Sequence, residues 1–127
     1  MTKNVMIIPG ITKPELPFNH VIRAGRFLFL TSQLSSDLKT GEIKSGTIVE
    51  QTRQSLDNIK LLLEGCGATM DDIVKVVIYI RNLKDFDRVN EVYCEYFTKG
   101  DEPARVAMQA ISPLEGIDIE IEVVAYK

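Results

Sequence analysis

One run of eight residues near the middle of the chain constrains the fold more than any other segment. Residues 73–80 read Ile-Val-Lys-Val-Val-Ile-Tyr-Ile, so apolar and mostly β-branched side chains fall on both faces of an extended strand. This pattern is typical of an interior strand that is covered on each side. The sequence therefore predicts a sheet with helices on one face and a second cover on the other.

Two amphipathic segments can supply the helices. Thr47 and Glu50 have the spacing of a capping box, in which each side chain binds the backbone N–H of the other residue at a helix start. Gly65 marks the expected end of this first helix, whose inward stripe is Ile48, Thr52, Leu56, Ile59 and Leu63. We expect Asp85 to cap a second helix that ends before Lys99, with Phe86, Val89, Val92 or Tyr93, and Tyr96 facing inward.

The remaining patterns complete an α+β sheet. Residues 21–22 and 27–30 predict a hairpin around the turn at 24–26, and residues 35–46 predict a surface loop. Residues 104–111 and 117–126 predict the last two strands. The expected order is strand, strand, helix, strand, helix, strand, strand, with both helices on one face and residues 1–127 in a single domain.

The last strand alternates strictly, with Ile117, Ile119, Ile121 and Val123 on one side and Asp118, Glu120 and Glu122 on the other. On the preceding strand Arg105, Ala107 and Gln109 share one side, and we expect them to join Glu120 on the face that the helices leave bare. Val77 and Tyr79 would add an apolar patch there, which soluble proteins generally cover by association. We therefore expect an oligomer with clefts between its subunits.

Composition excludes several classes of partner. The formal charge of -3 and the lack of a basic stretch argue against nucleic acid. Neither Cys66 nor Cys94 has a nearby Cys or His, so free thiols in a reducing cytosol are expected and a metal site is not. The sequence contains no secretory leader pattern and no membrane-spanning run, which favours a soluble cytoplasmic protein.

Motifs spread over nearly the whole chain resemble those of the reactive-intermediate deaminase (RidA/YjgF) family. The C-terminal signature is Pro103-Ala104-Arg105 followed by Ile119-Glu120-Ile121. The other matching segments, in order, are Pro17-Phe18-Asn19-His20, Thr31-Ser32-Gln33, Lys39-Thr40-Gly41-Glu42, residues 51–58, Asp85-Phe86 and Val89-Asn90. Their order, rather than any one of them, carries the resemblance.

The resemblance implies a chorismate-mutase-like fold of the bacterial trimeric type, which is a mixed sheet with two helices on one face. It also implies a homotrimer with three sites between subunits. The implied activity is hydrolysis of 2-aminoacrylate, 2-iminobutanoate and 2-iminopropanoate to 2-keto acids and ammonia, with no metal and no organic cofactor.

The chemistry of a 2-imino acid suits two of the matching residues. Arg105 can bind the substrate carboxylate through two parallel hydrogen bonds, and Glu120 can position water and move its proton at the imine carbon. The resemblance places five further residues at the substrate: Phe18, Thr31, Ser32, Asn90 and Ala107.

Four of these positions depart from the deaminating branch, which usually has Tyr at Phe18, Ser-Gly at Thr31-Ser32 and Cys at Ala107. The ring at Phe18 loses a hydroxyl, and Ser32 places a side chain where Gly lets backbone approach the ligand. We expect the catalysed reaction to survive and the preference among imino acids to shift.

Simpler interpretations remain open at this point. Arg105 could form a structural ion pair, and Glu120 could be one of several solvated carboxylates on a strand. A trimeric module that binds small carboxylates without turnover is the main alternative function. Ribonuclease or translation-inhibitor activity ranks last, because a pI near 5.2 does not indicate an RNA-binding surface.

Overall fold

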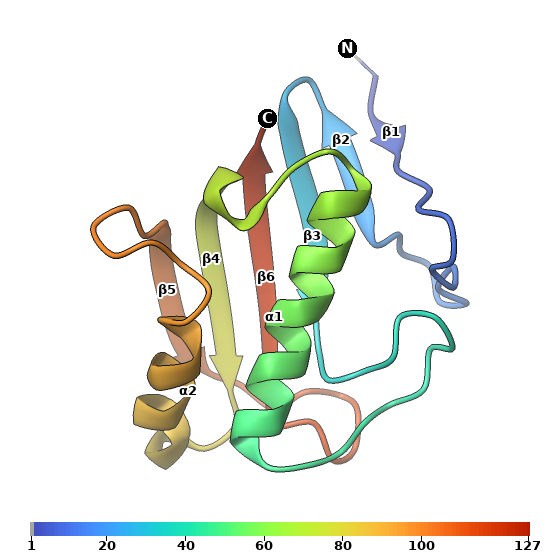
Figure 1. Ribbon diagram of the computed structural model, residues 1–127. Coiled ribbons are helices and arrows are strands. Elements are labelled where there is room, and N and C mark those ends of the chain that lie inside the picture. Colours follow the sequence, from blue (N-terminus) through green and yellow to red (C-terminus); the bar gives the residue numbers. More distant parts are fainter. Residues whose placement is uncertain (1) are drawn as a thin grey trace.

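The computed structural model describes residues 2–127 as one six-stranded mixed sheet with two α-helices on one face (Figure 1). The helices are α1 (Ile48–Gly65) and α2 (Phe86–Tyr93), and short 3-10 turns occupy Met70–Asp72 and Leu83–Asp85. The strands are β1 (Asn4–Val5), β2 (Val21–Ala24), β3 (Phe27–Gln33), β4 (Ile73–Ile80), β5 (Ala104–Gln109) and β6 (Ile119–Tyr126). The predicted α+β class and the packing of both helices on one face are confirmed.

The sheet has the order β1-β2-β3-β6-β4-β5. Strand β4 runs antiparallel to β6 and parallel to β5, so it is the interior strand that its sequence predicts. The last two strands of the chain are not neighbours, because β4 separates them. Strand β5 therefore forms one edge of the sheet, and the two-residue β1, which the sequence did not predict, forms the other.

Helix α1 begins and packs as its sequence predicts. The Thr47 side chain accepts a hydrogen bond from the Glu50 N–H at 3.1 Å, and the Glu50 carboxylate accepts one from the Thr47 N–H at 3.0 Å. All five residues of the predicted stripe are buried. Gly65 is the last helical residue, but the left-handed turn that ends the helix lies at Gly67, with φ of 78°.

Helix α2 is shorter than expected and is not capped as expected. The Asp85 side chain makes no capping hydrogen bond, because a 3-10 turn ending at Asp85 leads directly into the helix. After Tyr93 the backbone tightens into i→i−3 hydrogen bonds, from the Glu95 N–H to Val92 O and from the Tyr96 N–H to Tyr93 O. The helical hydrogen-bond pattern is thereby lost well before Lys99.

The core fills the space between the helices and one face of the sheet. Its sheet residues include Val76, Ile78, Ile80, Ile119, Ile121 and Val123, and its helix residues include Leu56, Ile59, Leu63 and Val89. None of the helices in residues 2–127 is long and apolar enough to cross a membrane.

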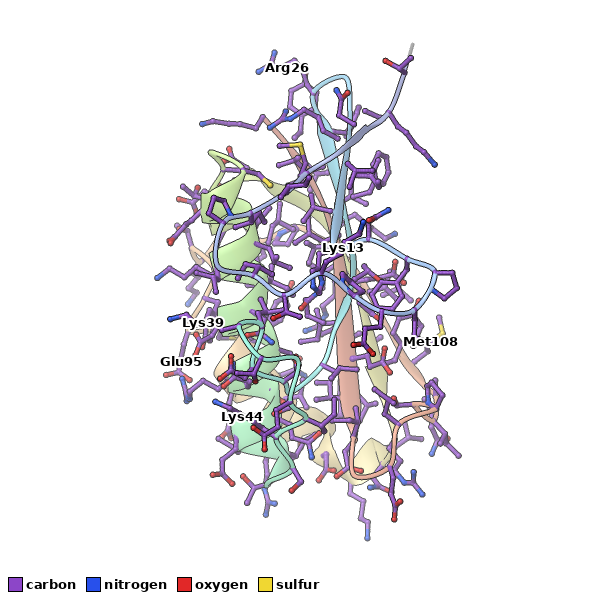
Figure 2. The ribbon with its side chains drawn as sticks, turned by 90° about the vertical axis from the view of Figure 1, so that its right-hand side faces the viewer. Lys13, Arg26, Lys39, Lys44, Glu95 and Met108 are labelled. Carbon is purple, nitrogen blue, oxygen red and sulfur yellow. The ribbon has the colours of Figure 1, made fainter. Side chains whose placement is uncertain are left out.

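The opposite side of the sheet, called the open face below, has no helix over it. Its residues include Phe27, Phe29, Val77, Tyr79, Val106, Met108, Glu120, Glu122, Val124 and Tyr126, as the pairing registers and burial show. Phe29 and Met108 are 46% and 47% exposed there. Figure 2 shows Met108 on the side of the sheet away from helix α1. The predicted uncovered apolar patch with Val77 and Tyr79 is therefore present in the protomer.

Candidate functional site

Arg105 lies on the helix side of the sheet and not on the open face. In the parallel register of β4 and β5, Arg105 pairs with Val76, which is buried beneath the helices. Paired residues of neighbouring strands point to the same face, so Arg105, Ala107 and Gln109 face the helix side. Glu120 pairs with Tyr79 on the open face. The expectation that Arg105, Gln109 and Glu120 share one face is therefore wrong within a protomer.

Helix α2 holds the Arg105 side chain in place. Its Nη1 atom donates a hydrogen bond to Asn90 Oδ1 at 2.7 Å. The guanidinium carbon lies 4.8 Å from the ring centroid of Tyr93 and 5.7 Å from that of Phe86, both within cation–π range. No salt bridge involving Arg105 occurs among residues 2–127, so the structural ion pair is absent from the protomer. The remaining guanidinium donors are available to an anion.

The groove at Arg105 has a volume of about 610 Å³, and Tyr93 and Cys94 contribute to its wall. Burial raises the pKa of Tyr93 to about 12, while the nearby positive charge of Arg105 opposes this rise. Tyr93 therefore stays neutral near neutral pH. Its buried hydroxyl has no hydrogen-bond partner within residues 2–127.

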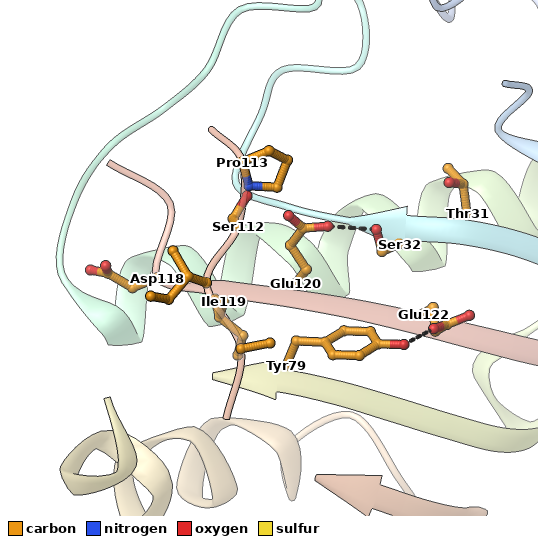
Figure 3. A pocket seen from close by; sticks show the side chains of 11 residues that line it. Thr31, Ser32, Tyr79, Ser112, Pro113, Asp118, Ile119, Glu120 and Glu122 are labelled. Carbon is orange, nitrogen blue, oxygen red and sulfur yellow. Dashed lines mark hydrogen bonds between the residues drawn. The ribbon is translucent and has the colours of Figure 1, made fainter. Parts of the chain in front are cut away.

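Glu120 lies in a separate cavity of about 430 Å³ on the open face (Figure 3). Ser32 Oγ donates a hydrogen bond to Glu120 Oε1 at 2.6 Å. The Tyr79 hydroxyl donates to the Glu122 carboxylate, and this hydrogen bond is the main reason that the pKa of Tyr79 is raised. Two neighbouring carboxylates on β6 are thus each bound by one hydroxyl.

The other expected site residues divide between these two places. Phe18 lines an adjoining cavity of about 350 Å³ together with Thr31 and Ser32, and the latter two also line the cavity of Glu120. Ala107 is exposed on β5 and pairs with Ile78, so it lies on the same face as Arg105. The protomer therefore carries one group of Arg105, Asn90 and Ala107, and another group of Glu120, Ser32, Thr31 and Phe18.

Comparison with known proteins identifies the family. A family model described as Endoribonuclease L-PSP matches residues 11–127. A RutC family protein of Pyrococcus horikoshii is 45% identical over 125 residues, which cover 98% of each chain. The chain belongs to the RidA/YjgF family.

Members of the RidA/YjgF family with more specific names are also similar. The human 2-iminobutanoate/2-iminopropanoate deaminase is 33% identical over 109 residues, covering 86% of this chain and 79% of the human protein. The crystal structure of Escherichia coli TdcF with bound serine superimposes with a TM-score of 0.86 at 27% identity, covering 98% of each chain. The fold implied by the family resemblance is thereby supported over almost the full length.

In the protomer of this RidA/YjgF protein, Glu120 and Arg105 line two different cavities. The cavity of Glu120 is lined by three carboxylates, those of Asp118, Glu120 and Glu122, and by no Lys or Arg. The groove of Arg105 contains a cation that can anchor a carboxylate, but Glu120 is not among its residues. The three carboxylates of the first cavity would repel an anionic ligand, whereas Arg105 and Lys99 in the groove would attract one beside the carboxylate of Glu102.

The sequence analysis did not identify Tyr93, Tyr79 and Glu122 as residues of the candidate site. Tyr93 follows Asn90 by three residues, the spacing that places both on one side of a helix. Glu122 follows Glu120 by two residues and therefore shares its strand face. These two spacings were the available signals. The pairing of Tyr79 with Glu120 depends on the strand register, for which the sequence holds no direct signal.

Proposed function

We propose that this protein hydrolyses 2-imino acids to 2-keto acids and ammonia at sites shared by two subunits of a homotrimer. Each site takes Arg105 and Asn90 from one subunit and Glu120, Ser32, Thr31 and Phe18 from the next. Ala107 on the edge strand β5 would lie between the two groups.

One observation carries this proposal: the carboxylate anchor and the acidic base lie on opposite faces of one sheet. Arg105 is held towards α2, and Glu120 faces the open side of β6. Because β4 and the sheet itself separate them, no side-chain rotation within one protomer can bring them to the same small substrate. A second copy of the chain can, since it presents the missing group on a different surface.

The open face supports association of the required kind. It exposes Phe27, Phe29 and Met108 on the same face as the acidic cavity, so an interface there would bury apolar surface. Strand β5 lies at the sheet edge, where a neighbouring subunit can approach the Arg105 groove. A contact between two different surfaces of one chain closes into a ring when the rotation fits, and three subunits form such a ring.

The chemistry follows from the two groups. Arg105 binds the substrate carboxylate, with Asn90 fixing the orientation of the guanidinium. Glu120 accepts a proton from water as the water oxygen bonds to the imine carbon and the C=N electron pair moves to nitrogen. The same carboxyl then returns this proton to nitrogen, which gives a carbinolamine. Glu120 next moves the proton of the carbinolamine hydroxyl to nitrogen as the C–N bond breaks and the C=O bond forms, so that ammonia is released and a 2-keto acid remains. Holding the electrophilic imine beside an oriented water molecule contributes most of the rate acceleration.

The named relatives support this reaction without deciding it. The human relative is named for deamination of 2-iminobutanoate and 2-iminopropanoate, and the TdcF structure holds serine, a small molecule with a carboxylate and an amino group. The family model is described by a ribonuclease name, but three carboxylates at the Glu120 cavity would repel a phosphodiester.

The test generates 2-aminoacrylate or 2-iminobutanoate in situ with a dehydratase and follows keto-acid release. The parent protein should accelerate release, and the Arg105→Ala variant should not. Binding of 2-oxobutanoate by a parent protein that gives no acceleration would instead support the carboxylate-binding module.

A further inference from the structure

Strand β3 contains a bulge that changes which side chains reach the site. Leu30 pairs with Val123 and Gln33 pairs with Ile121, so three steps along β3 match two steps along β6. One extra residue is therefore inserted within 31–32. Without it, strict alternation would turn Ser32 towards the core.

The burial of these residues follows the bulge. Leu30 and Gln33 are both buried, with 4% and 3% exposure, whereas Thr31 and Ser32 are half-buried and line the cavity of Glu120. Figure 3 shows the Ser32 and Glu120 side chains pointing toward one another from β3 and β6. The bulge thus places two consecutive side chains on the open face.

The bond from Ser32 Oγ to Glu120 Oε1 measures 2.6 Å, the length of a strong O–H···O⁻ hydrogen bond. It fixes one carboxylate oxygen of the half-buried Glu120 side chain. Oε2 accepts no hydrogen bond from residues 2–127, so this oxygen can contact water. Tyr79 also lines this cavity, but its hydroxyl donates its hydrogen bond to Glu122 and not to Glu120.

We propose that Ser32 is a positioning residue, which orients Glu120 so that Oε2 faces the attacking water. This inference rests on the proposed role of Glu120 and deepens it. It also gives the Ser32 hydroxyl, at the position where the deaminating branch usually has Gly, a role other than substrate contact. A hydroxyl that positions the base acts on kcat, whereas a hydroxyl that touches the substrate acts chiefly on KM.

The test compares Ser32→Ala and Ser32→Thr in the parent protein and in the Glu120→Ala background. In the parent, Ser32→Ala should lower kcat about tenfold with KM within about twofold, and Ser32→Thr, which keeps the hydroxyl, should recover most of the loss. In the Glu120→Ala background, Ser32→Ala should have no further effect on kcat. Ser45→Ala, at an exposed serine outside the site, is the matched control and should equal the parent.

Different results identify which part of the account fails. An unchanged kcat for Ser32→Ala, or an equal loss in both backgrounds, overturns the positioning role. An inactive parent overturns the proposed function instead. The hydrogen bond is then still tested by the melting temperature at fixed protein concentration. Ser32→Ala should lower this temperature in the parent and not in the Glu120→Ala background, and equal shifts in both would overturn the inference.

Discussion

At the scale of single residues, Arg105 is distinguished by what surrounds it rather than by its charge. Asn90 accepts one of its hydrogen bonds, and the rings of Tyr93 and Phe86 lie within 4.8 and 5.7 Å of the guanidinium carbon. An arginine fixed on one side by α2 loses little further freedom when it binds an anion on its other side. A planar carboxylate is the ligand that this arrangement favours.

Replacing Arg105 should therefore weaken ligand binding, whereas replacing Glu120 should lower turnover. Arg105→Lys keeps the charge but loses the two-pronged geometry, so binding of 2-oxobutanoate should weaken by tens-fold, or about 2 kcal/mol. Glu120→Gln is nearly isosteric and should bind the keto acid almost normally while turnover falls by ~100-fold. Calorimetric titration together with the dehydratase-coupled assay measures both quantities. Parent-like binding and turnover in Arg105→Lys, or full turnover in Glu120→Gln, would contradict these assignments.

At the scale of elements, the strongest sequence patterns were the most reliable predictors. The run at β4 has apolar side chains on both faces, and the capping box at Thr47 specifies where α1 begins. Both signals are local and need no knowledge of neighbouring strands. The position of β4 and the start of α1 were predicted correctly from them.

Two features could not be predicted in this way: which side chains of β5 face the helices, and the bulge in β3. Along β5, one alternating set contains Arg105 and Gln109 and the other contains Val106 and Met108, so hydropathy predicts that the apolar set faces the helices, and this prediction is wrong. The register with β4 decides which set faces the helices. The bulge leaves no glycine or other sequence mark at Thr31 or Ser32, because it depends on the pairing of β3 with β6.

The capping box provides one stability prediction at this scale. Thr47→Ala removes the side-chain oxygen that accepts the Glu50 N–H, and the free energy of unfolding should fall by about 1 kcal/mol. Ser45→Ala, two residues earlier on exposed chain, is again the control. Equal stability of Thr47→Ala and the parent in denaturant titrations would show that the cap contributes nothing.

A tyrosine links α1 to the segment after α2 and provides a pH-dependent prediction. The Tyr96 hydroxyl donates a hydrogen bond to Asp57 Oδ1 at 2.6 Å. Burial is the larger cause and this hydrogen bond the next one of a rise in the pKa of Tyr96 from 10.0 to about 12. Because the unfolded chain loses this proton first, the stabilisation is complete below pH 10 and is lost as pH rises through 12.

The Tyr96→Phe variant should therefore show a smaller fall in stability than the parent between pH 10 and 12. Some fall should remain, because the pKa of Tyr93 is also raised to about 12. Melting temperatures at one fixed protein concentration give the comparison. Parallel curves for the variant and the parent would exclude this linkage at Tyr96.

At the scale of the whole molecule, two features of the protomer support the proposed association. Its open face exposes apolar side chains, and Arg105 and Glu120 lie on opposite faces of the sheet. Sedimentation should give a particle of three 14.3 kDa subunits at micromolar concentration. A stable monomer would contradict the proposed assembly.

Subunit complementation tests the shared site most directly. Alone, Glu120→Ala should retain about 1% of parent activity and Arg105→Ala should not accelerate keto-acid release. A mixture of preformed trimers of the two variants should do no better. The two variants are then mixed in equal amounts, unfolded and refolded together. In the resulting trimers a site is complete only where Arg105 of a Glu120→Ala subunit meets Glu120 of an Arg105→Ala subunit. Random assembly should then restore about one quarter of parent activity, because each of the two groups is intact in half of the subunits. Failure to recover any activity, although mixed trimers are isolated, would contradict a site built from two subunits.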